Sequence, residues 1–453
     1  MPPAVEEFGV EPIPAELRTA RWRDLFAINF TFFLNPVMYL LGAFAVVDGG
    51  LPLWWAVAAM VVGQAFAYAL LVVIAQPGVD YGLSGQVAMR AHLGFWGARL
   101  LSSPYRVIAA TYWFAAQALT AALGAQAIVD AMTGHRLRLV PLALLFAVVH
   151  ATLAVLGFDV MRWLLRVVLP VSLAFSGILI ALFLATDDPD YAVGRVFDSP
   201  DQGFTWVGFA TYVTVMCVAS LTLVGNIADF CRYTPTRRDM RFGLAASAIS
   251  AALVTTFIGG YAAAATGEIN PFIAVADLTS SDLLLALLLA AIVVQGLAAN
   301  ITNVYTAGLS LVNTIPRLGR IWATIAAAVG AVALSAFPDF VNNAQNWITH
   351  LGNLGAPLTG VVLADYLVAQ RRRIDVPALF DPHGRYRYLN GVNVRAIVAV
   401  AVGVAVYYVV PSSWIKVIWG LSFGAGAYLI LAALRAAMRA DASATVTPPS
   451  SPS

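Results

Sequence analysis

The stretch "NFTFFLNPVMYLLG", residues 29–42, places the pair Asn35-Pro36 inside a long apolar segment. Proline lacks a backbone N–H and its ring clashes with the preceding helical turn, so a helix is expected to bend or break at this point. In transporters such breaks often expose backbone carbonyl groups that bind a substrate or an ion, whereas a simple kink is the alternative. The segment therefore predicts an interrupted membrane helix, with Asn35 as a candidate binding residue.

The composition is that of an integral membrane protein. Of the 453 residues, 60% are hydrophobic and 11% are charged, whereas soluble domains carry about 25% charged residues. The two cysteines are too few for a disulfide framework or a metal cluster. The arginines gather in loop clusters rather than in a basic domain. A nucleic-acid partner is therefore not expected, and the lipid bilayer is the expected environment.

Long apolar runs predict twelve transmembrane helices. A helix needs about 20 apolar residues to cross the hydrocarbon core, and helices satisfy every backbone amide without water. The runs are continuous, whereas a membrane barrel would show alternating segments of about 10 residues. The predicted spans cover residues 26–48, 53–75, 104–130, 139–157, 162–185, 204–228, 242–265, 283–311, 319–337, 343–369, 394–410 and 413–435.

The distribution of basic residues predicts the orientation of the chain in the plasma membrane. Lys and Arg gather in the cytoplasmic loops of membrane proteins. With both termini in the cytoplasm, only Arg136, Arg138, Arg195 and Lys416 fall outside, and the outer loop "TDDPD" at 186–190 is acidic. An even number of spans agrees with this asymmetry, because one missed helix would invert every later loop.

Two polar side chains share one face of the third span. "TYWFAAQALTAALG", residues 111–124, sets Trp113 and Gln117 four positions apart, with Thr120 and Gly124 on the same side. Tryptophans usually lie at membrane interfaces, but Trp113 lies roughly ten residues inside the span. A deep indole beside an amide suits a flat heterocycle that stacks on one and hydrogen-bonds to the other. The alternative is a core tryptophan whose N–H is bound by Gln117.

Further polar residues lie in the eighth and tenth spans. Asn300 and Asn303 are three positions apart, and two amides together can recognise donors and acceptors on the edge of a ring. In the tenth span, His350 falls on one side with Asn353 and is expected to face the bundle. Polar groups inside a membrane often mark a substrate path, but they also join helices, and both interpretations stay open. His150 in the fourth span is interpreted as structural.

The chemistry expected of the chain is transport rather than catalysis. The sequence contains neither H-E-x-x-H nor the phosphate-binding G-x-x-x-x-G-K. A membrane enzyme that acts on lipid is the alternative class, and Asp229 with Arg232 is then the nearest candidate for a catalytic cluster. No catalytic residue and no cofactor is predicted, apart from a coupling cation.

Four segments, in order along the chain, carry a resemblance to a known family. They are "FTFFLNPVMYLLGA" (30–43), "GNIADFCRY" (225–233), "NITNVYTAGLSL" (300–311) and "GVVLADYLVAQRRR" (360–373). Each alone is weak, but together they resemble the nucleobase–cation symporter family, which includes the cytosine, purine, hydantoin, allantoin and thiamine-type permeases. The resemblance covers residues 30 to about 373.

The resemblance implies a LeuT-type fold, in which two five-helix repeats of opposite orientation are followed by two further helices. The first helix of each repeat is broken at mid-membrane, and for the sixth span this break is implied by the resemblance alone. The expected organisation is a cytoplasmic tail at 1–25, a first repeat at 26–185, a second repeat at 204–369, a cytoplasmic loop at 370–393, helices 11 and 12 at 394–435, and a disordered tail at 440–453.

The resemblance also implies a substrate site. Trp113 and Gln117 match positions where hydantoin-type members stack on the ring and hydrogen-bond to it, and Asn300 matches a family amide. Ala219 and Ser220 match the broken part of the sixth span, where members commonly carry Gly or Ser and then an aromatic residue. Ser220 departs from that pattern, so the second stacking face comes from elsewhere or the ligand differs. The expected ligand is a nucleobase or a related small nitrogenous heterocycle or vitamin precursor, imported by alternating access by a monomeric chain.

A second departure concerns the coupling cation. Na⁺-coupled members place two hydroxyl residues before the asparagine of the eighth span, and this chain has Ala298 and Ala299 there. Carbonyl groups near Phe33 and Pro36 remain, but Na⁺ is a hard cation that prefers several oxygen ligands. H⁺ is therefore favoured over Na⁺, with His350 as the titratable candidate. Facilitated diffusion and a Na⁺ site rebuilt from other oxygen atoms are the alternatives.

Overall fold

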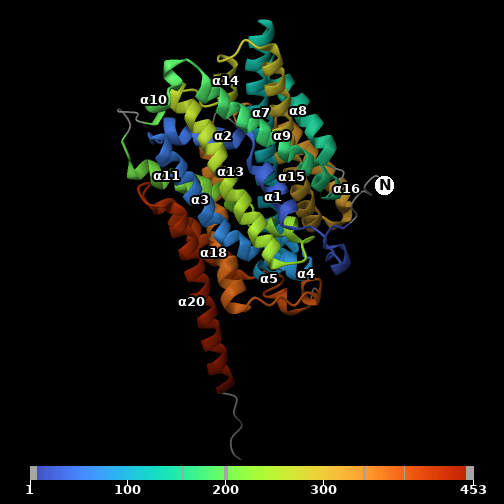
Figure 1. Ribbon diagram of the computed structural model, residues 1–453. Helices are drawn as coiled ribbons and strands as arrows, with labels where there is room; N and C mark the ends of the chain where they lie inside the picture. The colour runs from blue at the N-terminus through green and yellow to red at the C-terminus, as the bar shows by residue number, and fades with distance from the viewer. Residues whose placement is uncertain (1–7, 155–157, 198–202, 340–342, 382, 445–453) are drawn as a thin grey trace, which may run out of the picture.

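A computed structural model describes residues 8–154, 158–197, 203–339, 343–381 and 383–444. Within these ranges the chain folds into helices, the longest of which pack side by side as a bundle (Figure 1). An isolated bridge between Leu389 and Val392 is the single β-pairing in the described ranges. Residues 445–453 of the predicted disordered tail lie outside the description, and residues 440–444 continue the last helix.

Most of the helices follow one another with short connections, whereas a longer segment, residues 365–393, joins α18 to α19. The longer ones are α1 (Trp22–Phe33), α2 (Pro36–Val47), α3 (Leu53–Ile74), α7 (Ser103–Thr133), α8 (Leu139–Ala154), α9 (Phe158–Ala185), α11 (Trp206–Leu221), α13 (Arg237–Thr266), α15 (Asp282–Thr314), α16 (Gly319–Leu334), α18 (Ala344–Ala364), α19 (Val394–Val409) and α20 (Lys416–Ala444). The shorter ones are α4 (Gln76–Tyr81), α5 (Gly85–Leu93), α6 (Phe95–Gly97), α10 (Val193–Phe197), α12 (Ile227–Cys231) and α14 (Pro271–Ala276).

Short 3-10 and π-helical segments complete the described structure. One group consists of 3-10 turns, at Ala15–Leu17, Pro189–Tyr191, Pro316–Leu318, Pro377–Leu379 and Arg385–Arg387. The other consists of two π-helical segments, Ala98–Ser102 before α7 and Asp365–Ala369 after α18.

Eight helices in the described ranges are long and apolar enough to cross a membrane, and α1 with α2 forms a ninth candidate as a bent pair. Three further apolar helices, α8, α11 and α19, are shorter. Each of the twelve predicted spans overlaps one of these helices or the bent pair. Residues 155–157, at the end of the fourth predicted span, lie outside the described ranges.

The helix predicted across Asn35-Pro36 is interrupted there. The axes of α1 and α2 differ in direction by 58°, and Asn35 is extended between them (φ −145°, ψ 161°). Its side-chain oxygen accepts a hydrogen bond from Met38 N at 3.0 Å, which caps α2, and Pro36 occupies the first helical position, where no N–H is needed. Its side-chain nitrogen donates to Phe32 O at 2.5 Å, at the end of α1. One asparagine therefore terminates one helix and begins the next.

A second interruption separates α11 from α12. Hydropathy predicted one helix over 204–228, and the resemblance implied a break within it. In the structure α11 ends at Leu221, residues 222–226 form turns, and α12 is a short helix of five residues. Packing against α5 explains the difference. Asp229 Oδ1 accepts a hydrogen bond from Gly85 N at 2.7 Å, and a Cβ on Gly225 would lie 2.6 Å from Gln86 Nε2. The tertiary contact at "GNIADFCRY" therefore specifies the turn, which hydropathy alone does not indicate.

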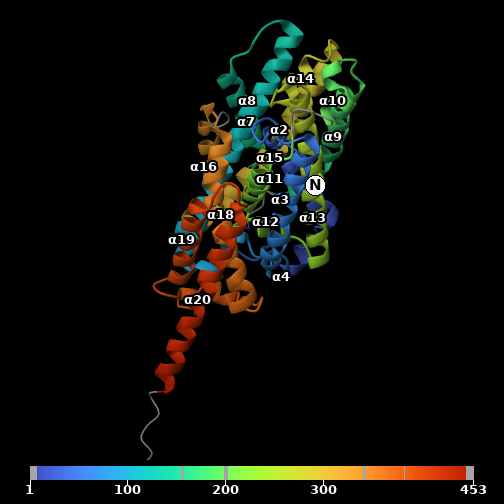
Figure 2. The same cartoon turned by 90° about the vertical axis from the view of Figure 1, so that its left-hand side faces the viewer.

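The two interruptions lie in the interior of the bundle. Helices α7 and α15 pack along one another, α13 packs against α1, α2 and α3, and α11 packs between α3 and α18. Helices α19 and α20 pair beside α18, and α20 extends beyond the body of the bundle (Figure 2). This arrangement brings four elements to a common point: the α1–α2 break, the end of α11, helix α7 and helix α15.

Candidate substrate site

A small closed cavity lies where these four elements meet. Its volume is about 10 Å³, which is room for about one water molecule. Pockets that hold small molecules usually measure about 300–1,000 Å³, so a ring enters only after the surrounding helices separate. The lining residues are Phe32, Phe33, Asn35, Met38, Trp113, Gln117, Ala219, Thr222 and Asn303.

The cavity brings together six residues that the sequence had singled out. These are Phe33, Asn35, Trp113, Gln117, Ala219 and Asn303. Sequence reasoning missed the remaining three. Phe32 and Met38 flank the helix break, so their nearness to Asn35 was a usable signal. Thr222 follows Ala219 and Ser220, where the resemblance implied a break, so its position was also a usable signal, although hydropathy predicted that the helix continues past Leu221.

Trp113 is buried, with 3% of its surface exposed. The alternative in which Gln117 binds the indole N–H is wrong. Gln117 Oε1 instead accepts a hydrogen bond from Val37 N at 3.3 Å, in the first turn of α2. Within the described part of the chain, neither the indole N–H nor Gln117 Nε2 makes a hydrogen bond. Both groups belong to residues that line the cavity, so both are suited to meet a ligand there.

Asn303 connects the cavity to a buried arginine. Arg106 Nη2 donates to Asn303 Oδ1 at 3.1 Å and to Thr306 Oγ1 at 2.8 Å. Arg106 is fully buried, and its Nη1 has no hydrogen-bond partner in the described structure. Asn303 Nδ2 is likewise buried and unpaired among the described residues. An intramembrane cation is rare and usually functional.

Two other predicted residues lie outside the cavity lining. Asn300 Nδ2 lies 3.0 Å from His150 Nδ1, and His150 Nε2 lies 3.2 Å from the carbonyl oxygen of Val293. His150 thus joins α8 to α15, as its structural interpretation expects. Ser220 Oγ donates to Gln64 Oε1 at 2.5 Å and is buried.

The predicted cation positions are occupied by ordinary protein contacts. Ala298 and Ala299 are fully buried. Near the break, Phe33 O accepts a hydrogen bond from Asn35 N at 3.0 Å, and Pro36 begins α2. In the described ranges no group of three or more His, Cys, Asp or Glu residues lies close enough together to hold a metal ion.

The expectation that His350 faces the bundle is wrong. Its side chain is exposed, and its ring nitrogen Nδ1 lies 3.5 Å from the hydroxyl of Tyr408 on α19. Asn353, three positions later, is buried. The edge of the buried face of α18 therefore passes between these two residues, which the short sequence pattern did not resolve.

On one side of the cavity, α14 packs against α7. A Cβ on Gly124 would lie 2.9 Å from Phe272 Cβ, so this glycine permits the close approach of α14. The Phe272 ring meets Tyr39 of α2 edge to face, with 5.6 Å between centroids. Gly124 is seven residues beyond Gln117, or about 10 Å along the helix. Phe272 and Gly124 therefore form a packed layer over the cavity.

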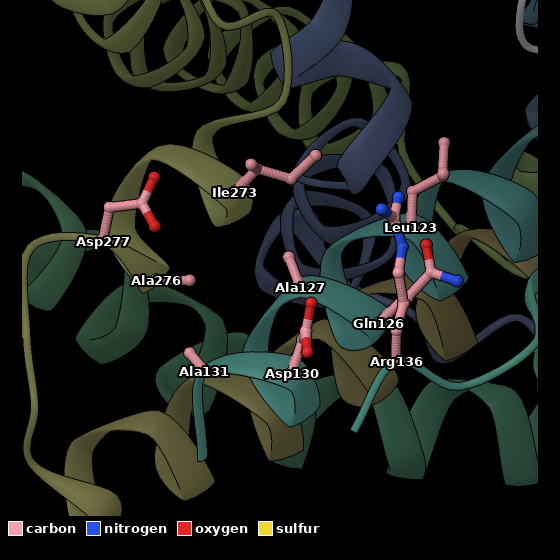
Figure 3. A pocket seen from close by; sticks show the side chains of 9 residues that line it. All are labelled: Leu123, Gln126, Ala127, Asp130, Ala131, Arg136, Ile273, Ala276 and Asp277. Atoms are coloured by element: carbon pink, nitrogen blue, oxygen red, sulfur yellow. The ribbon is translucent and has the colours of Figure 1, made fainter. Parts of the chain in front are cut away.

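Beyond this layer lies a larger pocket of about 440 Å³. Figure 3 shows Ile273 and Ala276 of α14, and Asp277 directly after it, across from residues of α7 and the loop that follows α7. The lining residues on that second side are Leu123, Gln126, Ala127, Asp130, Ala131 and Arg136. The chain thus carries a wide polar pocket near the end of α7 and a narrow cavity deeper in the bundle.

Asp229 and Arg232, the candidates for a catalytic cluster that acts on lipid, make contacts that hold the fold together. Asp229 binds the backbone of Gly85, as described above, and Arg232 Nη1 donates to Gly9 O at 3.1 Å. Both side chains are fully buried. They hold α12 and the N-terminal segment in place, away from any surface that a lipid headgroup reaches.

Comparison with known proteins identifies the fold. The structure of a nucleobase-cation-symport-1 family transporter, in a closed conformation with bromovinylhydantoin bound, matches with a TM-score of 0.80 at 22% identity, covering 93% of each chain. A Na⁺-coupled sialic acid symporter matches with a TM-score of 0.62 at 12% identity, covering 92% of this chain and 90% of the other. The chain therefore has the fold of these transporters.

Comparison of sequences identifies the family. A hydantoin permease of Microbacterium maritypicum is 24% identical over 405 residues, covering 86% of this chain and 81% of that protein. A purine-uracil permease of Arabidopsis thaliana is 26% identical over 439 residues, covering 89% and 71%. The model of a family described as permease for cytosine/purines, uracil, thiamine and allantoin matches residues 12–431. The chain belongs to this family of membrane permeases, which are transporters rather than enzymes.

Proposed function

We propose that the protein is a secondary transporter that imports a small, flat nitrogenous heterocycle by alternating access. The observation that carries the proposal is the closed cavity at the α1–α2 break, lined by Trp113 and by the amides of Gln117 and Asn303. An aromatic face and two amides are the groups that a planar, hydrogen-bonding ring requires. The hydantoin-bound transporter of the same fold and the permease relatives support this ligand class.

In this proposal Trp113 stacks on the ring, and Gln117 and Asn303 bind its edges. Asn35 shapes the site by holding the two half-helices together. Ser220 offers no aromatic face, so Phe32 or Phe33 of α1 supplies the second one from within the cavity lining. Asn300 acts through the position of α15, since its side chain binds His150.

The proposed arrangement in the membrane has twelve spans. The three shorter apolar helices, α8, α11 and α19, complete the count begun by the eight long helices and the bent pair. We place residues 26–185 and 204–369 in two inverted repeats, with α1–α2 and α11–α12 as their interrupted first helices. The chain is proposed to act as a monomer in the plasma membrane, with both termini in the cytoplasm.

For the coupling ion we propose independence from Na⁺ at the position used by Na⁺-coupled relatives. Two methyl side chains, Ala298 and Ala299, stand at the positions where the family resemblance implies hydroxyl groups in Na⁺-coupled members. Asn35 supplies the donors that satisfy the carbonyls of Phe32 and Phe33. A cation there has fewer oxygen ligands, and removing a cation from water without them is unfavourable. H⁺ is the proposed alternative, without assigning it to His350.

Uptake into proteoliposomes tests the transport proposal. Purified protein is reconstituted, and the accumulation of radiolabelled uracil, cytosine, hydantoin, allantoin and xanthine is measured in parallel with wild type and Trp113→Ala. Saturable uptake that is lost in Trp113→Ala supports the site. Trp322→Ala is the matched control, because Trp322 on α16 is 67% exposed and remote from the cavity. Conversion of a lipid into a product, without uptake of any ring, would overturn the proposal.

A further inference from the structure

Of the three amides that line the cavity, those of Gln117 and Asn303 are each held in one orientation by a partner that can only donate hydrogen bonds. A backbone N–H has no acceptor, so Val37 N requires the oxygen of Gln117 at its 3.3 Å contact. A guanidinium has no acceptor either, so Arg106 requires the oxygen of Asn303 at 3.1 Å. Neither amide can be turned over without placing two donors against each other.

The consequence is that the unpaired polar groups of both amides are donors, because each oxygen already accepts one hydrogen bond and, in the described part of the chain, each NH₂ group makes none. Gln117 Nε2 makes no hydrogen bond within the described ranges, and Asn303 Nδ2 is buried without a partner among the same residues. The indole N–H of Trp113 adds a third donor. An unpaired buried donor is unfavourable, so this cavity is suited to a ligand that brings acceptors.

Asn35, the other amide in the lining, does not change this balance. Its oxygen is bound to Met38 N and its nitrogen to Phe32 O. Thr222 donates its hydroxyl proton to Ala219 O at 2.7 Å, within its own helix end. Asn35 is therefore paired at both ends, and the oxygen of Thr222 is a single neutral hydroxyl acceptor set against the donors of Trp113, Gln117 and Asn303.

We propose that the site selects rings that present carbonyl oxygens on two edges, such as hydantoin, uracil or xanthine, over rings that present an amino group there, such as cytosine or adenine. The proposal rests on the transport function proposed above and narrows its substrate class. Arg106 is the positioning residue. It does not touch the ring, but it holds Asn303 with its N–H groups available, and its positive charge strengthens them as donors.

The burial of Arg106 supports this role. The side chain is fully buried, and its contacts with Asn303 and Thr306 join α7 to α15 beside the cavity. Thr306 Oγ1 lies 3.1 Å from the carbonyls of Thr302 and Asn303, so its hydroxyl proton is directed at its own helix and its oxygen accepts from Arg106. The guanidinium thus has one geometry available, and Asn303 follows it.

Ligand binding to purified full-length protein tests the proposal. Thermal shift and radioligand competition are measured with matched pairs of rings that exchange one carbonyl for an amino group, uracil with cytosine and xanthine with guanine. Wild type is expected to bind the ring with more carbonyls about tenfold or more tightly, because each mismatch leaves a donor facing a donor. Equal affinity within both pairs, or tighter binding of the amino-bearing rings, would overturn the inference.

Two substitutions separate the positioning role from a structural one. Asn303→Asp keeps an oxygen for Arg106 and turns the ring-facing atom from donor into acceptor, so the preference should shift toward the amino-bearing ring of each pair. Arg106→Met frees the amide of Asn303 to turn, so the preference should shrink to about twofold or less. Arg320→Met, a buried arginine on α16 outside the cavity lining, is the control and should keep the wild-type preference.

The outcomes distinguish this inference from the proposed function. Suppose that Trp113→Ala loses all ring binding and that wild type shows no preference for carbonyl-bearing rings. The proposed transport function then stands, and the selection rule is refuted. Absence of binding by every ring in the panel refutes both. If Arg106→Met does not fold, Asn303→Asp alone decides the matter, because an unchanged preference in that variant refutes the role of the fixed amide.

Discussion

The side-chain oxygen of Gln117 accepts a hydrogen bond from the backbone N–H of Val37, 3.3 Å away. This contact joins the middle of α7 to the first turn of α2, directly after the helix break. It uses a backbone donor that has no partner within its own helix, because the first N–H groups of any helix lack one. The side chain of Gln117, which we propose binds the substrate, is therefore coupled to the broken helix, and a change in one should affect the other.

Substitution of Trp113 by alanine should remove ligand binding while leaving the fold intact. The indole makes no hydrogen bond within the described ranges, so its loss exposes no unpaired buried group. Stacking of a ring on an aromatic side chain is worth about 1–3 kcal/mol, which corresponds to a loss of affinity of about 5- to 150-fold. Radioligand binding and a thermal melt of the same sample measure the two effects. Transport kinetics equal to those of wild type would exclude Trp113 from the site.

Gln117→Leu should change which ring substituents are accepted more than it changes overall stability. The variant loses one donor to the ring and leaves Val37 N without its acceptor, at a cost of about 1–3 kcal/mol. Competition by rings that differ in one substituent reports the preference. Gln126→Leu on the same helix, outside the cavity, is the matched control. A preference that stays the same in Gln117→Leu assigns this residue a structural role only.

Asn35→Ala should lower both stability and transport, because it removes the cap of α2 and the donor to Phe32 O. Loss of an N-cap costs about 1 kcal/mol, and the second hydrogen bond adds about the same. Thr236→Ala removes the N-cap of α13, far from the cavity, and provides the comparison. The melting temperature should fall in both variants, whereas transport should fall only in Asn35→Ala. Equal transport in the two would restrict Asn35 to capping.

Uptake should not follow an imposed Na⁺ gradient. Ala298 and Ala299 offer methyl groups where an ion would need oxygen ligands. Proteoliposomes with separately imposed Na⁺ and pH gradients measure the dependence. Accumulation driven by Na⁺ alone would show that the ion is bound by other oxygen atoms of the chain.

His350→Gln should leave uptake unchanged under either gradient, since the side chain is exposed and its ring contacts Tyr408 rather than the cavity. Uptake under a pH gradient is compared in wild type and in this variant at equal protein density. A pH-driven signal that disappears in His350→Gln would return the proton-carrying role to this residue.

The sequence was informative where one residue type has one structural consequence. Pro36 cannot continue a helix, and the chain bends at that point. Trp113 and Gln117 are four positions apart on a helix that exists, so they lie on one face and meet the same cavity. Hydropathy located the apolar helices for the same reason, because the bilayer admits few other residues.

The sequence was uninformative where long-range packing decides. The end of α11 at Leu221 depends on contacts of the following turn with α5, which lies more than 100 positions earlier. Whether His350 is buried or exposed depends on which neighbouring helix covers that face of α18. The orientation of Asn303 depended on Arg106, and no local pattern connects an arginine of the third predicted span to an amide of the eighth.

The small volume of the central cavity bears on leakage. A carrier without cargo must return to the other face, and any space that it keeps open during this movement carries solvent and dissolved ions across. With room for about one water molecule at its centre, and with Phe272 packed against Gly124 on one side, this protein can complete the empty return while carrying almost nothing. In the transport cycle that we propose, little of an ion gradient across the membrane would then be lost during the return.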